Sequence, residues 1–302
     1  MGRTRSSAAW ISVTSNLVLI VMKVVAGVLT GSIAILTEAI HSSIDLVSSV
    51  IALLSVKKAE EPADEDHPYG HEKAEHVGAG AEAMLILVGA GIVIFEAVRR
   101  LFGGGEIDAI GIGIAIIAAS IVLNLVVSGF LYRRAAHFES PALEGDAAHL
   151  RADALTSIAV LVGLALVEIT GYAVFDSIAA LVVAGAIVGT GVRLAKRSGN
   201  VLMDRTLPDD ELDEIEAAIA EARPPSMAGY HKLRARRAGS VRHVDLHVQF
   251  REGTSLERAH QEAHELRDAI EARFGNAEVL IHVEPEDSYS PPEKNDWPLR
   301  SG

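Results

Sequence analysis

The sequence has 302 residues, of which 49% are hydrophobic and 5% aromatic, with a formal net charge of −13 and a mean hydropathy of +0.28. The acidic balance argues against nucleic acid as a partner, and the absence of cysteine excludes disulfides and thiolate metal sites. Charged residues are sparse between His76 and Val192 and dense after Arg193. This shift indicates a membrane domain followed by an acidic soluble domain.

Six apolar segments are long enough to cross a bilayer core of about 30 Å as helices. We expect these spans at residues 8–30, 32–56, 79–102, 107–132, 147–167 and 173–192. The first has no small-residue cleavage site after a short apolar core, so we interpret it as an anchor and not as a removed signal. Lys23 within it is interpreted as a snorkelling or water-facing side chain. Residues 1–198 are therefore predicted to form a six-helix transmembrane domain.

Lysine and arginine are concentrated on one side of the predicted spans, with Arg99 and Arg100 as the main exceptions. The residues on that side are Arg3, Arg5, Lys57, Lys58, Lys73, Arg133, Arg134, Arg193, Lys196 and Arg197. Because cytoplasmic loops carry the excess of these residues, both termini are predicted to be cytoplasmic, in the inner membrane if the source is bacterial. The segments 57–78 and 133–146 are expected to be the longer loops.

Two of the predicted spans carry a histidine and an aspartate four residues apart, one helical turn apart on one face. The pairs are His41 with Asp45 and His149 with Asp153. An ionisable side chain at mid-membrane costs about 2.5–3.5 kcal/mol. A solvated surface pair would not account for this cost in two separate spans. Two such helices together offer two imidazole nitrogens and two carboxylates. That tetrahedral set suits Zn²⁺ better than the octahedral ions.

After the last span, the pattern predicts a small domain of order α-β-β-α-β over residues 199–285. Helical spacing covers residues 209–222 and 256–274, and strands are expected at 230–237, 241–250 and 279–283. The order suits a two-layer α+β domain of ferredoxin-like type. Residues 286–302 are polar and proline-rich, which predicts a disordered tail.

Two further clusters of metal-binding residue types lie outside the spans. Asp64, His67 and His71 are close together in the first long loop, a pattern that fits a divalent ion and a solvated acidic loop equally well. The predicted soluble domain holds the second cluster, on its strands and second helix: His231, His243, Asp245, His247, His260, His264, His282 and Glu284. Alternating residues on a strand share one face, so this cluster favours a metal site over a histidine-rich surface.

Together these residues resemble the cation diffusion facilitator family, in particular its bacterial zinc/iron-type metal exporters, over residues 6–284. The resemblance rests on the six spans, the paired His-x-x-x-Asp motifs and the loop motif Asp64-x-x-His67-x-x-x-His71-x-Lys73-Ala-Glu75. It also rests on Met203-Asp-Arg205-x-Leu-Pro208, which leads into the small α+β domain.

The resemblance implies a homodimeric exporter of Zn²⁺ or a similar divalent metal that exchanges the metal for protons across the lipid bilayer. Its sites map onto a transport site at His41, Asp45, His149 and Asp153, a loop site at Asp64, His67 and His71, a cytoplasmic site at His231, His247, His260, His282 and Glu284, and an interdomain salt bridge between Lys73 and Asp204. Two residues depart from the family pattern. His41 stands where some zinc/iron members have aspartate, and Glu284 replaces a shorter aspartate.

We therefore predict a Zn²⁺/H⁺ antiporter, with zinc both transported and regulatory, in which proton and metal compete for the same ligands. The alternatives are an exporter of Fe²⁺, Cd²⁺, Co²⁺ or Mn²⁺ and a membrane-tethered metal sensor without transport. An enzyme is not expected. A metallohydrolase of the His-Glu-x-x-His type is disfavoured because His260-Gln-Glu-Ala-His264 displaces the glutamate.

Overall fold

The computed structural model describes residues 4–30, 33–103, 111–172 and 174–287. The side chains of some residues within helices, His41 among them, also lie outside the described part. The chain divides into two compact units, residues Met1–Asn200 and Val201–Gly302.

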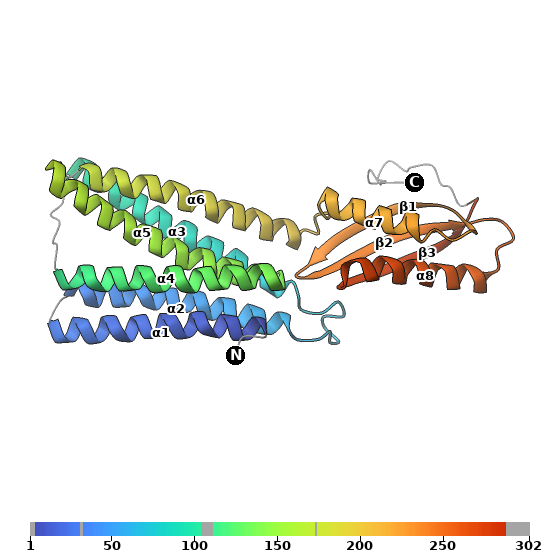
Figure 1. Ribbon diagram of the computed structural model, residues 1–302, viewed down its shortest axis with the longest axis horizontal. Helices are drawn as coiled ribbons and strands as arrows, with labels where there is room; N and C mark the ends of the chain where they lie inside the picture. The colour runs from blue at the N-terminus through green and yellow to red at the C-terminus, as the bar shows by residue number, and fades with distance from the viewer. Residues whose placement is uncertain (1–3, 31–32, 104–110, 173, 288–302) are drawn as a thin grey trace. The chain divides into compact units, whose positions relative to one another are not determined.

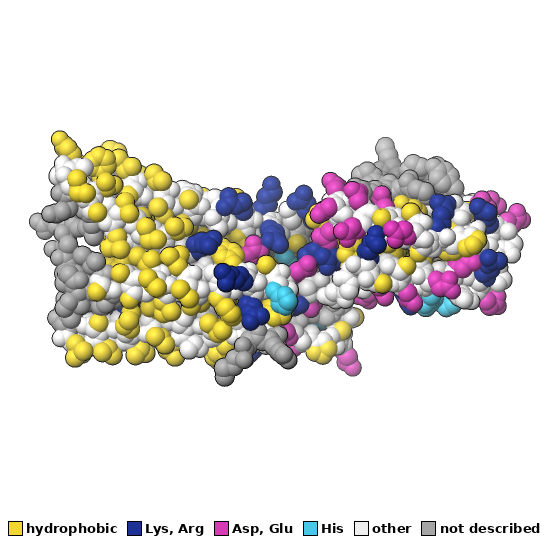
Figure 2. Space-filling view, viewed as in Figure 1, with side chains coloured by type: hydrophobic (Ala, Val, Ile, Leu, Met, Phe, Trp, Pro, Cys, Tyr) yellow, Lys and Arg dark blue, Asp and Glu magenta, His cyan; other side chains and the backbone are white. Residues whose placement is uncertain are grey.

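The first unit is built from long helices: α1 (Arg5–Thr30), α2 (Ile33–Ala59), α3 (Ala74–Gly103), α4 (Gly111–Phe138), α5 (Pro141–Thr170) and α6 (Val174–Leu202) (Figure 1). Within the described residues, α1, α3, α4, α5 and α6 are each long and apolar enough to cross a membrane. Figure 2 shows hydrophobic side chains covering the visible flank of this unit, with lysine and arginine side chains gathered toward one end. The prediction of a polytopic helical membrane protein is confirmed.

The connection between α4 and α5 is much shorter than the loop expected at residues 133–146. Helix α4 continues to Phe138 and α5 begins at Pro141. Ser140 is the N-cap, its Oγ accepting a hydrogen bond from the Leu143 amide, and proline at the first helical position suits a helix start. The predicted span ends where the apolar residues end, whereas the helix continues beyond that point.

Small residues bring the helices of this unit close together. A buried alanine-rich cluster joins α3, α5 and α6 and includes Ala79, Ala83 and Ile187. At Gly191 on α6, a Cβ atom would lie only 2.9 Å from Cγ of Leu87 on α3. Close backbone approach through small residues is the usual mode of helix association in membranes. This packing places polar side chains of neighbouring helices within contact distance.

The second unit consists of α7 (Asp209–Glu221), β1 (Met227–Ala238), β2 (Val241–Phe250), α8 (Leu256–Phe274) and β3 (Ala277–Pro285) (Figure 1). The sheet order is β1-β2-β3, with β1 antiparallel and β3 parallel to β2. The predicted element order and the two-layer α+β class are confirmed. Of the disordered tail expected at residues 286–302, residues 288–302 lie outside the described residues.

The two helices of this unit pack on one face of the sheet. Val244, Leu246, Val248 and Phe250 alternate along β2 and are buried with apolar residues of α7 and α8 in one core. Since successive side chains on a strand point to opposite faces, the intervening residues of β2, among them His247, lie on the other face. The sheet therefore presents its polar residues on the face without helices.

Candidate metal sites

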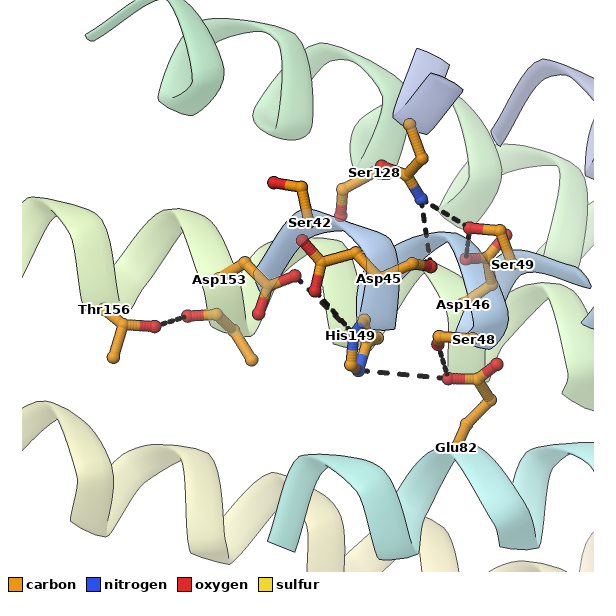
Figure 3. Close-up of polar contacts among 12 residues, drawn as sticks. Ser42, Asp45, Ser48, Ser49, Glu82, Ser128, Asp146, His149, Asp153 and Thr156 are labelled. Carbon is orange, nitrogen blue, oxygen red and sulfur yellow. Dashed lines mark hydrogen bonds and ion pairs between the residues drawn. The ribbon is translucent and has the colours of Figure 1, made fainter. Parts of the chain in front are cut away.

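A cluster of three ionisable side chains joins α2 and α5 inside the helix unit. His149 Nε2 lies 3.6 Å from Asp45 Oδ1 and 3.7 Å from Asp153 Oδ2 (Figure 3). One donor atom from each of the three residues lies within 4.8 Å of the others. A tetrahedral Zn²⁺ with bond lengths near 2.0–2.2 Å holds its ligands about 3.3–3.6 Å apart. The three donors therefore have room for one such ion between them.

Asp45, His149 and Asp153 line a partly open cavity of about 410 Å³. Asp45 and His149 are buried, with 7% and 6% of their surface exposed. Lys23, which we interpret from sequence as snorkelling or water-facing, is also buried and lines the cavity, donating a hydrogen bond from Nζ to Ser42 Oγ at 2.6 Å. The backbone of His41 belongs to α2, but its side chain lies outside the described residues.

Two fully buried carboxylates beside this cluster are absent from the sequence-based ligand set. Glu82 on α3 has Oε2 at 4.0 Å from His149 Nδ1 and accepts a hydrogen bond from Ser48 Oγ. Asp146 on α5 accepts a hydrogen bond from Ser49 Oγ at 3.1 Å. Neither is exposed to solvent. The sequence signal is an acidic residue within or beside an apolar span, which is costly and therefore points to a function.

The loop cluster forms a compact turn between α2 and α3. Asp64 contacts both histidines, with Oδ1 3.2 Å from His67 Nδ1 and Oδ2 3.3 Å from His71 Nε2. The His67 amide donates a hydrogen bond to Asp64 Oδ1, and this bond holds the pKa of the aspartate below its ordinary value. Gly70, at φ +80, has the left-handed conformation that the turn back toward His71 requires. The structure brings the three predicted loop residues together.

In the second unit, three histidines form a row across the sheet. His231 on β1 is the register partner of His247 on β2, which is the partner of His282 on β3. Glu284 joins them: its Oε2 lies 2.7 Å from His231 Nε2, and its Oε1 lies 2.6 Å from His247 Nδ1 and 3.6 Å from His282 Nε2. The helix-free face of the sheet thus gathers four of the five residues predicted for this site.

Among the described residues, the donor atoms of His231, His247 and Glu284 lie within 4.8 Å of one another. His260, the fifth predicted residue, is not in this group. It is on α8, where its ring centroid lies 4.3 Å from that of His264. His243 lies on the predicted face but contacts Glu278 at 3.1 Å. The structure therefore does not bring His260 into the row within this chain.

Lys73 lies in the first unit and Asp204 in the second. A salt bridge between them remains a prediction from the sequence. Within the second unit, Asp204 Oδ1 lies 3.3 Å from Arg236 Nη1. The pairing with Lys73 would therefore share a carboxylate that already has a guanidinium beside it.

Two family models match almost the whole chain. One is described as the cation efflux transmembrane domain and matches residues 9–203, and the other is described as the cation efflux protein, cytoplasmic domain, and matches residues 207–286. These matches account for both units.

Individual relatives match along most of their length. Uncharacterized transporter sll1263 of Synechocystis sp. is 32% identical over 277 residues, covering 92% of this chain and 89% of that protein. The cation-efflux pump FieF of Pectobacterium carotovorum is 34% identical over 269 residues, covering 89% of each. Among solved structures, the metal-bound C-terminal domain of the CzcD transporter from Thermotoga maritima is 28% identical, covers 27% of this chain and 93% of that chain, and has a TM-score of 0.25.

Proposed function

Because the chain belongs to the cation diffusion facilitator family, we propose that it exports Zn²⁺ from the cytoplasm in exchange for protons. Efflux of divalent metal cations across a membrane is the function common to this family, which consists of transporters and not of enzymes. The identity of the metal and the exchange for protons are our proposal for this chain.

The observation that carries the proposal is the position of His149 Nε2 between the carboxylates of Asp45 and Asp153. We propose His41 as the fourth ligand, since it lies one helical turn before Asp45 on the same face of α2. Two nitrogens and two oxygens in tetrahedral order favour Zn²⁺ over Mg²⁺ and Ca²⁺, which take more oxygen ligands. Fe²⁺, Cd²⁺, Co²⁺ and Mn²⁺ are the alternative cargoes, because availability as well as ligand type decides between them.

Proton exchange follows from the chemistry of the ligands. Imidazole and carboxylate bind a metal only in their deprotonated forms, so protons displace the metal and the metal displaces protons. Moving two positive charges outward against about 100 mV costs about 4.6 kcal/mol, and each returning proton gives back about 2.3 kcal/mol. Alternating access around the buried site would let each ion bind from one side and leave on the other.

We further propose that the second unit is cytoplasmic, that it binds zinc as a regulator, and that the protein is a homodimer in an inner membrane. The row of His231, His247 and His282 with Glu284 lies on the helix-free sheet face, where a second copy could supply His260 to complete the site. The loop residues Asp64, His67 and His71 are proposed as a third zinc site. Lys73 and Asp204 would hold the two units of each chain in a fixed relation.

The test is transport by the purified protein in liposomes. Addition of Zn²⁺ on one side should drive zinc across the membrane and move protons in the opposite direction, recorded with a zinc dye and a pH dye. Zinc movement without proton movement would contradict antiport. Zinc binding with no movement of either ion would favour the alternative of a membrane-tethered sensor.

A further inference from the structure

The imidazole of His149 has carboxylates on both sides. Its Nε2 faces Asp45 and Asp153, and its Nδ1 faces Glu82 at 4.0 Å (Figure 3). At these distances, neither ring nitrogen has a hydrogen-bond partner among the described residues. The ring is therefore oriented with one nitrogen toward the proposed metal position and the other toward the third carboxylate.

Glu82 is held in place by both helices that form the site. Its Oε2 accepts the hydrogen bond from Ser48 Oγ, and Ser48 lies three residues after Asp45 on α2. On α5, a Cβ atom at Gly145 would lie 3.0 Å from the Cβ and 3.1 Å from the Cγ of Glu82. Gly145 thus leaves the space that the glutamate occupies, one turn before His149. Glu82 Oε1 has no hydrogen-bond partner among the described residues.

Whether His149 can bind a metal between Asp45 and Asp153 depends on which of its two ring nitrogens carries the hydrogen. A neutral imidazole binds a metal through the nitrogen that has a free lone pair, and the other nitrogen then carries the hydrogen. A carboxylate that accepts the hydrogen from the second nitrogen fixes the tautomer, orients the ring and raises its basicity as a ligand. Glu82 faces Nδ1 at 4.0 Å, so a closer approach of the two side chains when a metal binds would complete this hydrogen bond and leave Nε2 to face Asp45 and Asp153.

We propose that Glu82 is a positioning residue of the metal site, accepting the Nδ1 hydrogen of His149 and adding a third negative charge beside the bound cation. This inference rests on the proposed function, because it takes His149 as a ligand through Nε2. It assigns a purpose to an acidic side chain that is otherwise costly to bury within an apolar helix. The consequence is a higher affinity for divalent cations than the ligands alone would give.

The experiment measures the dissociation constant for Zn²⁺ of the purified full chain by titration calorimetry, in a background carrying Asp64→Ala and Glu284→Ala so that the other two proposed sites do not contribute. Loss of a carboxylate behind a metal-bound histidine typically weakens metal binding about 10-fold to 100-fold. We expect a loss in this range for Glu82→Leu and a smaller loss for Glu82→Gln, whose amide oxygen still accepts the Nδ1 hydrogen. In transport, the KM for zinc should rise while kcat changes less.

Glu75→Gln is the matched control. Glu75 is also fully buried on α3, two turns before Glu82, but its partners are Arg5 and Ser140 and not a residue of the site. Its zinc affinity should equal that of the background. Equal weakening by Glu75→Gln and Glu82→Gln would reduce Glu82 to a structural role, and unchanged affinity in Glu82→Leu would overturn the proposal.

Two additional measurements keep the outcome decisive. Nitrogen NMR of ¹⁵N-histidine-labelled, zinc-loaded protein should show His149 with its hydrogen on Nδ1, a signal that Glu82→Leu weakens. If the Glu82 variants do not fold, Ser48→Ala, which releases Glu82 Oε2, should weaken zinc binding, and unchanged binding would overturn the proposal. The variant His149→Ala separates the proposed metal site from the proposed role of Glu82. Unchanged zinc affinity in His149→Ala would refute the metal site itself. Weaker zinc binding in His149→Ala, with unchanged binding in Glu82→Leu, would refute the role of Glu82 alone.

Discussion

The helix unit and the sheet unit use the same residue types in opposite states. In the sheet, Glu284 already lies at hydrogen-bond distance from His231 and His247, at 2.7 Å and 2.6 Å. Burial raises the pKa of Glu284, but the hydrogen bonds with the two histidines outweigh it, so the pKa lies below its ordinary value. In the helix unit, the His149 nitrogen stays 3.6–3.7 Å from both aspartates. In the sheet cluster the ligands already make hydrogen bonds to one another, whereas in the helix cluster the His149 nitrogen lies beyond hydrogen-bond distance from both aspartates.

The difference follows from what holds each cluster together. The sheet row is fixed by backbone pairing between β1, β2 and β3, and His282, with 63% of its side chain exposed, is accessible to solvent. The helix cluster depends on the packing of α2 against α5, and a relative movement of the two helices would change its geometry. A partly exposed site that backbone pairing fixes suits the sensing of metal concentration, whereas a buried site between two packed helices suits transport.

The largest expected effect comes from removing a carboxylate of the helix cluster. In Asp153→Ala, the metal keeps a poorly compensated charge in a low-dielectric site, and breaking a buried charge pair costs about 3–5 kcal/mol. We expect zinc uptake into everted vesicles to fall by about 100-fold or more, since about 1.4 kcal/mol corresponds to a factor of ten. Asp66→Ala, an exposed loop aspartate outside the proposed ligand sets, serves as the control. Wild-type uptake in both Asp153→Ala and Asp45→Ala would refute the site.

The next effect concerns selectivity in the same unit. His41→Asp changes the proposed ligand set from two nitrogens and two oxygens to one nitrogen and three oxygens. A carboxylate can bind through one or two oxygens and so admits larger ions of higher coordination number than tetrahedral Zn²⁺, so transport of Cd²⁺, Fe²⁺ or Mn²⁺ should rise relative to Zn²⁺. The measurement is a competition assay with pairs of metals in reconstituted vesicles. An unchanged order of preference would count against His41 as a ligand.

These two predictions depend on residues that sequence spacing alone brings out. The His-x-x-x-Asp pairs have the 3.6-residue period of a helix, and packing of α2 on α5 brings Asp45 to His149 and Asp153. In the sheet, period-two alternation puts His247 on the helix-free face. The predicted ranges of both helices and the three strands in the second unit agree with the structure to within a few residues, because turns and caps mark their ends in the sequence.

Other features depend on contacts between distant segments, and spacing does not reveal them. Glu82 is one of three acidic residues on the apolar helix α3, with Glu75 and Glu96, and only the packing of α3 on α5 places it beside His149. Conversely, His260 has the i,i+4 spacing of a ligand with His264, yet within one chain it is absent from the sheet cluster. The start of α5 at Pro141 has a local signal in Ser140-Pro141, which hydropathy overlooks.

A smaller effect is expected from opening the sheet cluster. Glu284→Ala removes the carboxylate that contacts His231, His247 and His282, so zinc binding by the second unit should weaken while the proposed transport site keeps its ligands. Spin labels on the second units of a dimer should report a shorter distance with zinc than with chelator in the wild type, since metal favours the state that completes the ligand set. In Glu284→Ala, the two distances should agree. Equal distances in the wild type would refute the regulatory role.

The proposed link between the two units should be smaller again. Lys73→Ala and Asp204→Ala are each expected to reduce transport, and the double variant should be no worse than the Lys73 variant, because both changes remove the same contact. An exposed pair contributes only about 0–1 kcal/mol, so we expect a loss of a few-fold in initial rates. Additive losses in the double variant would indicate that the two residues act separately, which Asp204 could do through Arg236.

The smallest effect on metal handling is expected from an ion pair in the second unit that involves no proposed ligand. Glu211 contacts Arg237 at 2.8 Å and Arg242 at 2.6 Å. Burial raises the pKa of Glu211, but the hydrogen bonds with Arg242 and Arg237 outweigh it, so the folded-state pKa lies below the ordinary value. Since hydrogen bonds to charged groups contribute about 1.5–3 kcal/mol, Glu211→Gln should lower the free energy of unfolding of this unit by about that amount without changing zinc affinity.

The pH dependence of this loss distinguishes an ionised pair from simple packing. A depressed folded-state pKa means that the contribution of Glu211 is complete above the unfolded-state pKa of about 4.3 and is lost as the pH falls through the lower folded-state value. Hydrogen exchange of β2 amides in the full chain should therefore be faster in Glu211→Gln than in the wild type at pH 7, and the difference should shrink below about pH 4.3. If Glu211→Gln also weakened zinc binding as much as Glu284→Ala, the effect of Glu284→Ala would reflect general destabilisation of the sheet, and the proposed contrast between a transport site in the helix unit and a sensing site in the sheet unit would lose its chemical basis.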